Sequence, residues 1–389
     1  MLVSLYDWFW NEKYWFPQEY SWADFEDSDE VVYPHPKDLL AVVPLTFVII
    51  IVRYTFERTV ALPLSRLMGV RDGRKIKASH NPILESFFRT QSQNPKEAQM
   101  SHLATQCNLS LRQVQCWFRH RRNQERPLLS AKFSEACWKF IFYFSSFFGG
   151  LLTVYNEPWF WKPELCWDGF PKQALKPAIY WWYLLEFGFY LSLLITLSFD
   201  IKRKDFKQQI IHHFSVIILI YFSYCANYIR IGTLVMLIHD VSDIFLEASK
   251  IFHYAQWKHT YHVLFILFAV VFLVSQLILF PNIILYTTYY DSMINPFFGY
   301  YFFNALLMVL QVLHVFWSGL IVRMIYKFVL AGGMQSDIRS DLEEHNTSDE
   351  VQAPRQKNGV TEQTIVISPG SGCRGAGPSR LANGHIPAT

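Results

Sequence analysis

The sequence has few charged residues, which argues against a set of soluble domains. Charged side chains make up 17% of the 389 residues, whereas apolar residues make up 51% and aromatic residues 17%. Soluble proteins carry about 25% charged residues. The aromatic content is typical of a membrane protein, in which Trp and Tyr gather at the two interfaces. We therefore expect an all-α protein that crosses a membrane several times.

Several motifs are missing as well. The six cysteines form no C-x-x-C pair and show no metal-ligand spacing, and no G-x-S-x-G motif for a serine nucleophile is present. The chain also lacks a positively charged start followed by a small-residue cleavage site. We therefore expect no metal, no resident cofactor and no cleaved signal peptide.

Apolar stretches predict a polytopic helical bundle with about seven spans. Residues 1–38 are acidic and aromatic, and the first span with its basic flank covers residues 39–66. Because basic residues mark the cytosolic side, the N-terminus is expected in the lumen. The odd number of spans then places the C-terminus in the cytosol. The further spans are expected near residues 138–155, 177–199, 205–226, 230–250, 262–286 and 300–330.

Residues 67–128 are polar and predict a small cytosolic unit of three short helices. Ser110 is placed to cap the last helix at its N-terminus. That helix carries Trp117, Phe118, Arg119, Arg121 and Arg122, and it resembles the recognition helix of a homeodomain. A homeodomain reads adenine with an asparagine, and His120 stands at that position here. We therefore expect a spacer or contact module rather than a DNA-binding domain.

The tail, residues 333–389, is rich in Gly, Ser, Pro and charge, so we expect it to be disordered in the cytosol. Hydroxyl residues near acidic residues make three positions candidates for phosphorylation. These candidates are Ser340, Thr347 and Ser348.

Ionisable residues interrupt the apolar stretch from residue 205 to 250. His212 and His213 lie about one turn inside its first helix, and His239, Asp240 and Asp243 lie inside the second. A charged residue near the centre of a span costs about 2.5–3.5 kcal/mol on insertion scales, so such residues usually face a bundle interior or a wet cavity. Together they predict a buried functional site in the cytosolic half of the membrane.

The stretch HHF…SYCANYIRIGTLVMLIHDVSDIFLEASK resembles the Lag1 motif of the ceramide synthases, which lies in their TLC domain. The resemblance implies a six-helix TLC core in residues 131–332 and residence in the endoplasmic reticulum. It also implies transfer of a long or very-long-chain acyl group from acyl-CoA to the amine of a sphingoid base. CoA is then a co-substrate, and the protein could pair with related synthases.

The family's essential residues match His212, His213, Asp240 and Asp243 in this sequence. A histidine can take a proton from an amine or attack a thioester itself, and a carboxylate can orient its ring. The residues leave both roles open, and the carboxylates could instead bind a divalent ion.

Two further segments have expected roles in substrate binding. A basic loop at the cytosolic mouth could bind the CoA phosphates. Its residues are Lys202, Arg203, Lys204 and Lys207. The family associates the luminal hairpin, residues 286–298, with the choice of acyl chain length. The residues expected to meet the end of the chain there are Tyr289, Tyr290, Asp291, Met293, Ile294 and Pro296.

Two other functions fit parts of the sequence. A lipid transporter or sensor on the same bundle would use the polar stripe as a pathway without chemistry. A membrane-tethered homeodomain regulator would require release of residues 67–128 from the two flanking spans. The histidine pair favours the enzyme, and amide product from purified protein would distinguish it from both alternatives.

Overall fold

The computed structural model describes residues 7–29, 31–73, 75–197, 205–290 and 297–331, and these residues form helices and no strand. The predicted all-α fold is thereby confirmed. The described residues belong to two compact units. The larger unit contains the residues up to 73 and from 127 onward, and the smaller unit contains residues 75–126.

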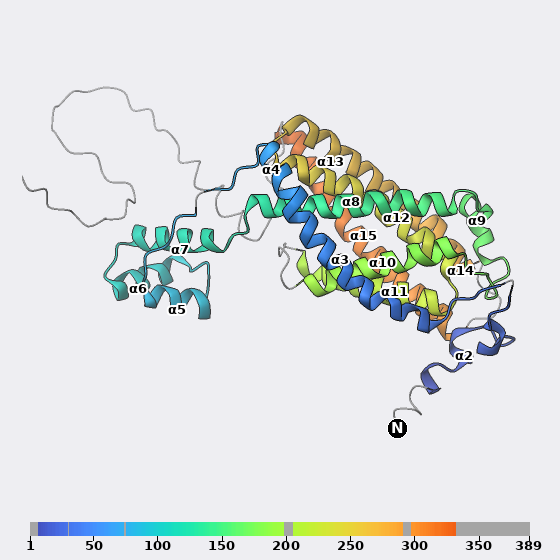
Figure 1. Cartoon of the computed structure of the whole chain (residues 1–389). Helices are drawn as coiled ribbons and strands as arrows, with labels where there is room; N and C mark the ends of the chain where they lie inside the picture. The colour runs from blue at the N-terminus through green and yellow to red at the C-terminus, as the bar shows by residue number, and fades with distance from the viewer. Residues whose placement is uncertain (1–6, 30, 74, 198–204, 291–296, 332–389) are drawn as a thin grey trace, which may run out of the picture. The chain divides into compact units, whose positions relative to one another are not determined.

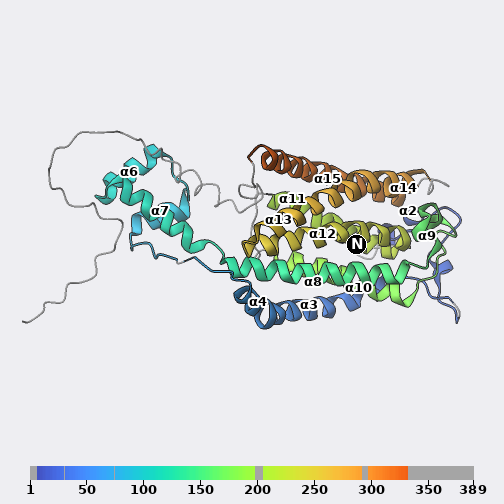
Figure 2. The ribbon, with the colours of Figure 1, turned by 90° about the horizontal axis from the view of Figure 1, so that it is seen from above.

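The larger unit is a bundle arranged around one helix, α12 (Ile229–Tyr254). Figures 1 and 2 show this helix running through the middle of the bundle. Its neighbours are α8 (Leu129–Val154), α11 (Phe206–Cys225), α13 (Lys258–Phe272) and the π-helical segment η5 (Leu273–Leu285). Around these, α10 (Pro177–Thr196) packs on α3 (Val42–Phe56), α8 and α11, while α15 (Phe298–Ala331) packs on α11 and η5.

Length and hydropathy make the chain a multi-pass membrane protein. Five helices are long and apolar enough to cross a bilayer: Pro36–Leu67, Leu111–Val154, Pro177–Thr196, Lys258–Tyr290 and Phe298–Leu330. Apolar side chains such as Phe47 and Val312 stay exposed on them, as a lipid-facing surface requires. The helices α11 and α12, with 20 and 26 residues, are long enough but carry the polar residues. A total of about seven spans stays a prediction.

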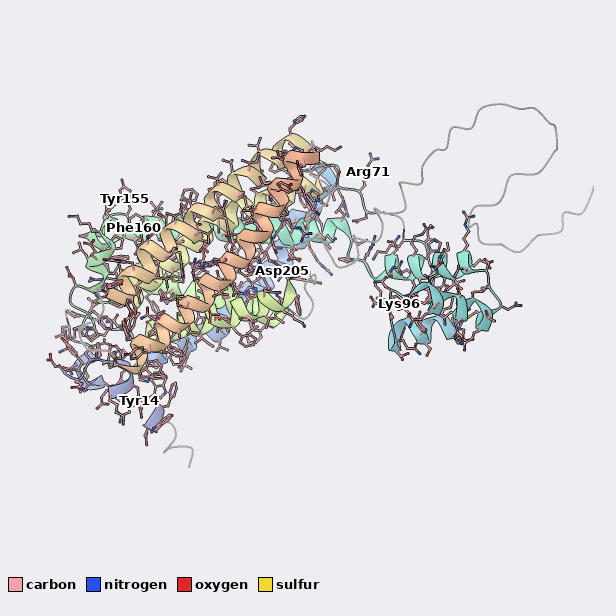
Figure 3. The ribbon with its side chains drawn as sticks, turned by 180° about the vertical axis from the view of Figure 1, so that it is seen from behind. Tyr14, Arg71, Lys96, Tyr155, Phe160 and Asp205 are labelled. Atoms are coloured by element: carbon pink, nitrogen blue, oxygen red, sulfur yellow. The ribbon has the colours of Figure 1, made fainter. Side chains whose placement is uncertain are left out.

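The N-terminal segment packs against one end of the bundle. The Trp15 ring stacks on Phe222 with ring centroids 4.9 Å apart, and the Tyr224 hydroxyl donates a hydrogen bond to Asp38 at 3.1 Å. Figure 3 shows Tyr14 at this end, together with Tyr155 and Phe160, and Arg71 at the opposite end. We call these the Tyr14 end and the Arg71 end. No pattern in the sequence predicted this packing.

The smaller unit consists of the three predicted helices, α5 (Pro82–Thr90), α6 (Glu97–Cys107) and α7 (Leu111–Glu125). Asn81 caps α5 by accepting from the backbone N–H groups of Ile83 and Leu84. Ser110 accepts from the N–H of Gln113 at 3.3 Å, which confirms it as the cap of α7. The core is formed by Leu84, Phe88, Leu103, Val114, Trp117 and Phe118.

An ion pair joins the first and last helices of the smaller unit. The Arg121 guanidinium donates to both carboxylate oxygens of Glu85, at 2.8 and 3.0 Å, and lies over the Phe88 ring. Arg89 binds the same carboxylate from one turn along α5. These hydrogen bonds, with Arg121 contributing most, lower the pKa of Glu85 to about 2. A bidentate arginine–carboxylate pair of this kind is among the stronger ion pairs at a protein surface.

Replacing Glu85 by Gln should destabilise the smaller unit by about 1 kcal/mol at pH 7. Because the pKa is lowered on folding, this stabilisation is present above pH 5 and is lost as the pH falls toward 2. Amide hydrogen exchange of the full-length protein should therefore speed up about fivefold in α5–α7 at pH 7. The Lys77→Gln variant, at an exposed position outside the three helices, is the control and should leave exchange unchanged. Equal exchange in the Glu85 variant would show that the pair contributes nothing.

Candidate functional site

The two adjacent histidines of α11 face different neighbours. The His212 ring lies edge-on to Trp317 of α15, with centroids 5.4 Å apart, and its centroid is 6.0 Å from that of His239 on α12. His213 Nε2 accepts from the Gln209 amide at 3.2 Å. Both histidines are buried, and the Nδ1 atom of each has no hydrogen-bond partner. In each ring, the Nδ1 atom is therefore shielded from water and makes no hydrogen bond.

A third and a fourth histidine bond to each other beside His212. The Nε2 atoms of His239 and His314 are 3.0 Å apart, and the Nδ1 atom of His239 lies 2.7 Å from the backbone oxygen of Val235. His314 comes from the middle of α15, and its side chain is 1% exposed. Helices α11, α12 and α15 thus bring three imidazole rings together.

A polar cavity lies among these histidines. His212, His213, His239 and His314 line it, and so does Asp243. Toward the Arg71 end, the lining contains two ion pairs, Lys139 with Glu135 at 2.5 Å and Lys250 with Glu247 at 2.6 Å. The cavity therefore offers neutral bases and fixed charges of both signs to a polar substrate group.

An apolar cavity continues from His239 toward the Tyr14 end. His239 lines both cavities. The apolar walls include Val216, Leu219, Met236, Leu307 and Leu310, and Tyr228, Phe303 and Thr288 lie at the far end. From His239 to Tyr228, α12 rises about 16 Å at 1.5 Å per residue. An apolar space beside a helix segment of this length suits a hydrocarbon chain.

Asp240 lies on another face of α12, against α8 and α10. It is fully buried beside Glu186 and Ser146, and neither of its carboxylate oxygens has a hydrogen-bond partner of good geometry. The Ser146 hydroxyl donates to Glu186 and accepts from the Trp182 indole. Two carboxyl groups so close together in an apolar interior cannot both be charged at reasonable cost. We therefore expect the two carboxyl groups to hold one proton between them.

The structure brings together three of the four predicted catalytic residues. His212, His213 and Asp243 line the polar cavity, whereas Asp240 belongs to the Glu186 pair behind it. The unused Nδ1 atoms of the two histidines show that neither aspartate orients the rings through that nitrogen. The catalytic roles of all four residues stay predictions.

The other predicted residues are placed only in part. Lys207 is exposed at the start of α11, while Lys202, Arg203 and Lys204 lie outside the described residues. Tyr289 and Tyr290 are exposed on α14 (Tyr286–Tyr290), and among the hairpin residues that the structure describes, Thr288 lines the apolar cavity. Outside the described residues lie Asp291, Met293, Ile294 and Pro296, and also Ser340, Thr347 and Ser348.

Sequence reasoning missed His314 and Glu186. Each is an ionisable residue inside a long apolar helix, which is the signal that singled out His212 and Asp240. The same rule applied to every span would have found both. It would not have paired them with residues on other helices, because such contacts follow only from the packing.

Comparisons with known proteins agree with this architecture. The TLC domain model matches residues 132–323, and the homeodomain model matches residues 74–127. The chain is 54% identical to ceramide synthase 4 of Homo sapiens, with all of both chains covered. It is 45% identical to ceramide synthase 3 of Homo sapiens over 89% of this chain and 90% of that protein. It is 39% identical to ceramide synthase 5 of Homo sapiens over 99% of this chain and 96% of that protein.

The buried acid pair predicts an unusual effect of substitution. Glu186→Gln keeps an oxygen for the Ser146 hydroxyl and gains an N–H group that can donate to Asp240, so the apparent melting temperature in detergent should rise by about 2–4 °C. Glu186→Ala removes both contacts and should lower the melting temperature. Glu164→Gln, at an exposed position, is the matched control and should have no effect. A fall for Glu186→Gln equal to that for alanine would contradict the shared proton.

Proposed function

We propose a function for this chain from the premise that it belongs to the ceramide synthase family, as its relatives over the whole length establish. It transfers the acyl group of a long or very-long-chain fatty acyl-CoA to the amine of a sphingoid base and forms dihydroceramide or ceramide. One observation supports this most directly. An apolar cavity fit for an acyl chain meets a polar cavity with four histidines, and His239 lies where the two join.

The two cavities divide the acyl-CoA between them. The hydrocarbon chain lies in the apolar cavity between α11, α12 and α15, with its methyl end near Phe303. The thioester carbon then lies near His239 and His212, whose ring centroids are 6.0 Å apart. CoA extends through the polar cavity toward the Arg71 end, past Lys139 and Lys250. Charge-assisted hydrogen bonds to such lysines suit its phosphates.

His212 is the residue best placed to act on the thioester. It lines the polar cavity beside His239, and Trp317 fixes one edge of its ring. As a nucleophile, its free nitrogen attacks the carbonyl carbon, CoA leaves as the thiolate, and the amine then attacks the acyl-imidazole. As a general base, it takes a proton from the amine while the amine attacks the thioester directly. His213, which accepts from Gln209 and lines the same cavity, assists His212.

The reaction requires no resident cofactor, because the thioester supplies the activated acyl group. Among the described residues, no group of three His, Cys, Asp or Glu side chains is arranged to hold a metal ion. We assign the chemistry to His212 and His213, with Asp243 beside them in the polar cavity. Lys207 and the loop before it complete the binding of the CoA phosphates.

We place the protein in the endoplasmic reticulum membrane, with the Tyr14 end in the lumen and the Arg71 end in the cytosol. Basic residues follow the first span at the Arg71 end, and acidic residues precede it, which supports this orientation. Cytosolic acyl-CoA then reaches the polar cavity directly. The sphingoid base comes from the bilayer, and pairing with related synthases is compatible with the exposed helix faces.

The first prediction of this function concerns the histidine pair. His212→Ala and His213→Ala proteins that insert and fold normally should make amide at least about 100-fold more slowly than the unaltered protein. The measurement is product formation from acyl-CoA and sphinganine by mass spectrometry. His259→Ala, at an exposed position outside both cavities, is the control. Unaltered turnover in both cavity variants would reject the proposed site.

Intact mass after incubation with acyl-CoA alone separates the two roles of His212. A covalent adduct that appears in the unaltered protein and is absent from His212→Ala identifies the nucleophile. If an active protein forms no adduct, His212 acts as the general base.

The second prediction concerns chain length. Phe303→Ala lengthens the apolar cavity at its far end, so the product profile should shift toward longer acyl chains by about two carbons or more, at about 1.25 Å each. Phe316→Ala removes an exposed ring from the same helix and is the matched control. Grafting residues 286–298 from a relative of different preference should also shift the profile, through the position of Thr288. If both variants are active and neither shifts the product profile, the acyl chain does not end at Phe303 or Thr288.

A further inference from the structure

His314 is a buried histidine to which the proposed acyl transfer gives no role so far. It sits in the middle of α15, and its closest polar contact is His239 at 3.0 Å, 75 residues earlier in the chain. The rings of Phe272 and Phe280 stand edge-on to it and shield it. Burying an ionisable side chain among aromatic rings inside a membrane span costs free energy, so such a residue usually has a function.

The hydrogen bonds fix where the protons lie when both rings are neutral. His239 Nδ1 lies 2.7 Å from the Val235 oxygen, so it carries a hydrogen and donates it. His239 Nε2 then has a lone pair, and His314 Nε2 carries the hydrogen between them. This leaves His314 Nδ1 as a lone pair, buried without a partner at the edge of the polar cavity. The tautomers follow from the bonding pattern.

Such a pair can accept one proton and no more. A proton that reaches His314 Nδ1 allows the hydrogen on His314 Nε2 to move to His239 Nε2. His239 then carries hydrogens on both nitrogens, and the Val235 carbonyl prevents further transfer because it cannot take a proton. Reversal of these two moves returns the proton to the cavity.

We propose that His239 and His314 form a one-proton store for amide formation, a role that rests on the proposed acyl transfer. In that reaction the N–C bond forms and the C–S bond of the thioester breaks. The attacking amine nitrogen loses one hydrogen, the CoA sulfur gains one, and no electrons leave the reactants. When the amine attacks the thioester directly, the store holds that hydrogen between its departure from nitrogen and its arrival at sulfur. While His212 carries the acyl group, its own ring cannot accept the hydrogen, so the store takes it from the amine and passes it to the CoA thiolate that was released before and still occupies the polar cavity.

The surroundings of the pair are consistent with this role. From α11, the titratable group facing it is His212. From α12, the charged groups in the same cavity are Asp243 and Glu247, and from η5 the facing residues are Phe280 and Gln276. Asp205, Glu135, Lys139 and Lys250 line the cavity farther toward the Arg71 end.

His314→Gln tests the proposal, because a glutamine amide can still donate to His239 Nε2 but cannot accept a proton. The ring of His239 should stay in place, and kcat for amide formation should fall about 100-fold at pH 7. The KM for acyl-CoA should change less than about threefold. The deficit should shrink as the pH rises to 9, because hydroxide then replaces the missing acceptor. His262→Gln, on α13 outside both cavities, is the control and should match the unaltered enzyme.

Three results would overturn the proposal while leaving the acyl transfer itself intact. The first is an unaltered kcat in His314→Gln. The second is a loss of kcat that has the same size at every pH. The third is a double variant, His314→Gln with His239→Gln, whose loss of kcat equals the product of the two single losses. Residues that act as one unit give no further loss in the double variant. If His314→Gln does not fold, His239→Gln alone carries the same prediction with α15 untouched. Failure of the unaltered protein to make amide would reject the acyl transfer instead.

Discussion

The structure depends on the cost of placing the polar face of α12 against lipid. Asp240, His239 and Glu247 are 0%, 8% and 4% exposed, and none of them could face hydrocarbon without a large penalty. The helix is therefore surrounded by α8, α11, α13 and η5, and α10 and α15 extend the enclosure. The apolar helices such as α3 and α15 keep exposed valine and phenylalanine side chains on the outside. The arrangement of the bundle follows from this one requirement.

Two of these helices, α12 and α15, change from mostly apolar to more polar residues about halfway along, and the site forms where this change occurs. On α12 the residues before His239 are mostly apolar, and those from His239 onward include the acids. On α15, His314 and Ser318 likewise follow a mostly apolar run that contains Phe303 and Leu310. Because α12 and α15 run in the same direction, both helices become polar at the same level of the bundle. An apolar cavity and a polar cavity then meet end to end, and a substrate with a long chain and a reactive head group is held across the junction.

Much of this architecture could be predicted from the sequence, but the contacts that make the site could not. The helices, the three-helix insert and the cap at Ser110 follow from local patterns of one or two turns. His212 and Asp240 stood out because each is an ionisable residue in an apolar span. Their actual partners, Trp317 for His212 and Glu186 for Asp240, lie on other helices. Nor does any local pattern show that Trp15 stacks on Phe222, since the N-terminal aromatic residues have no helical periodicity.

The central claim is that the acyl chain lies in the apolar cavity with its thioester at the histidines. Photo-crosslinking with two acyl-CoA probes tests it directly, one with a diazirine at the methyl end and one with a diazirine beside the carbonyl. After light and digestion, fragment sequencing should place the first label at or beside Phe303 or Tyr228. It should place the second label at or beside His212, His239 or His314. Labelling of the same residues by both probes, or labelling confined to the lipid-facing residues of α3 and α13, would contradict the account.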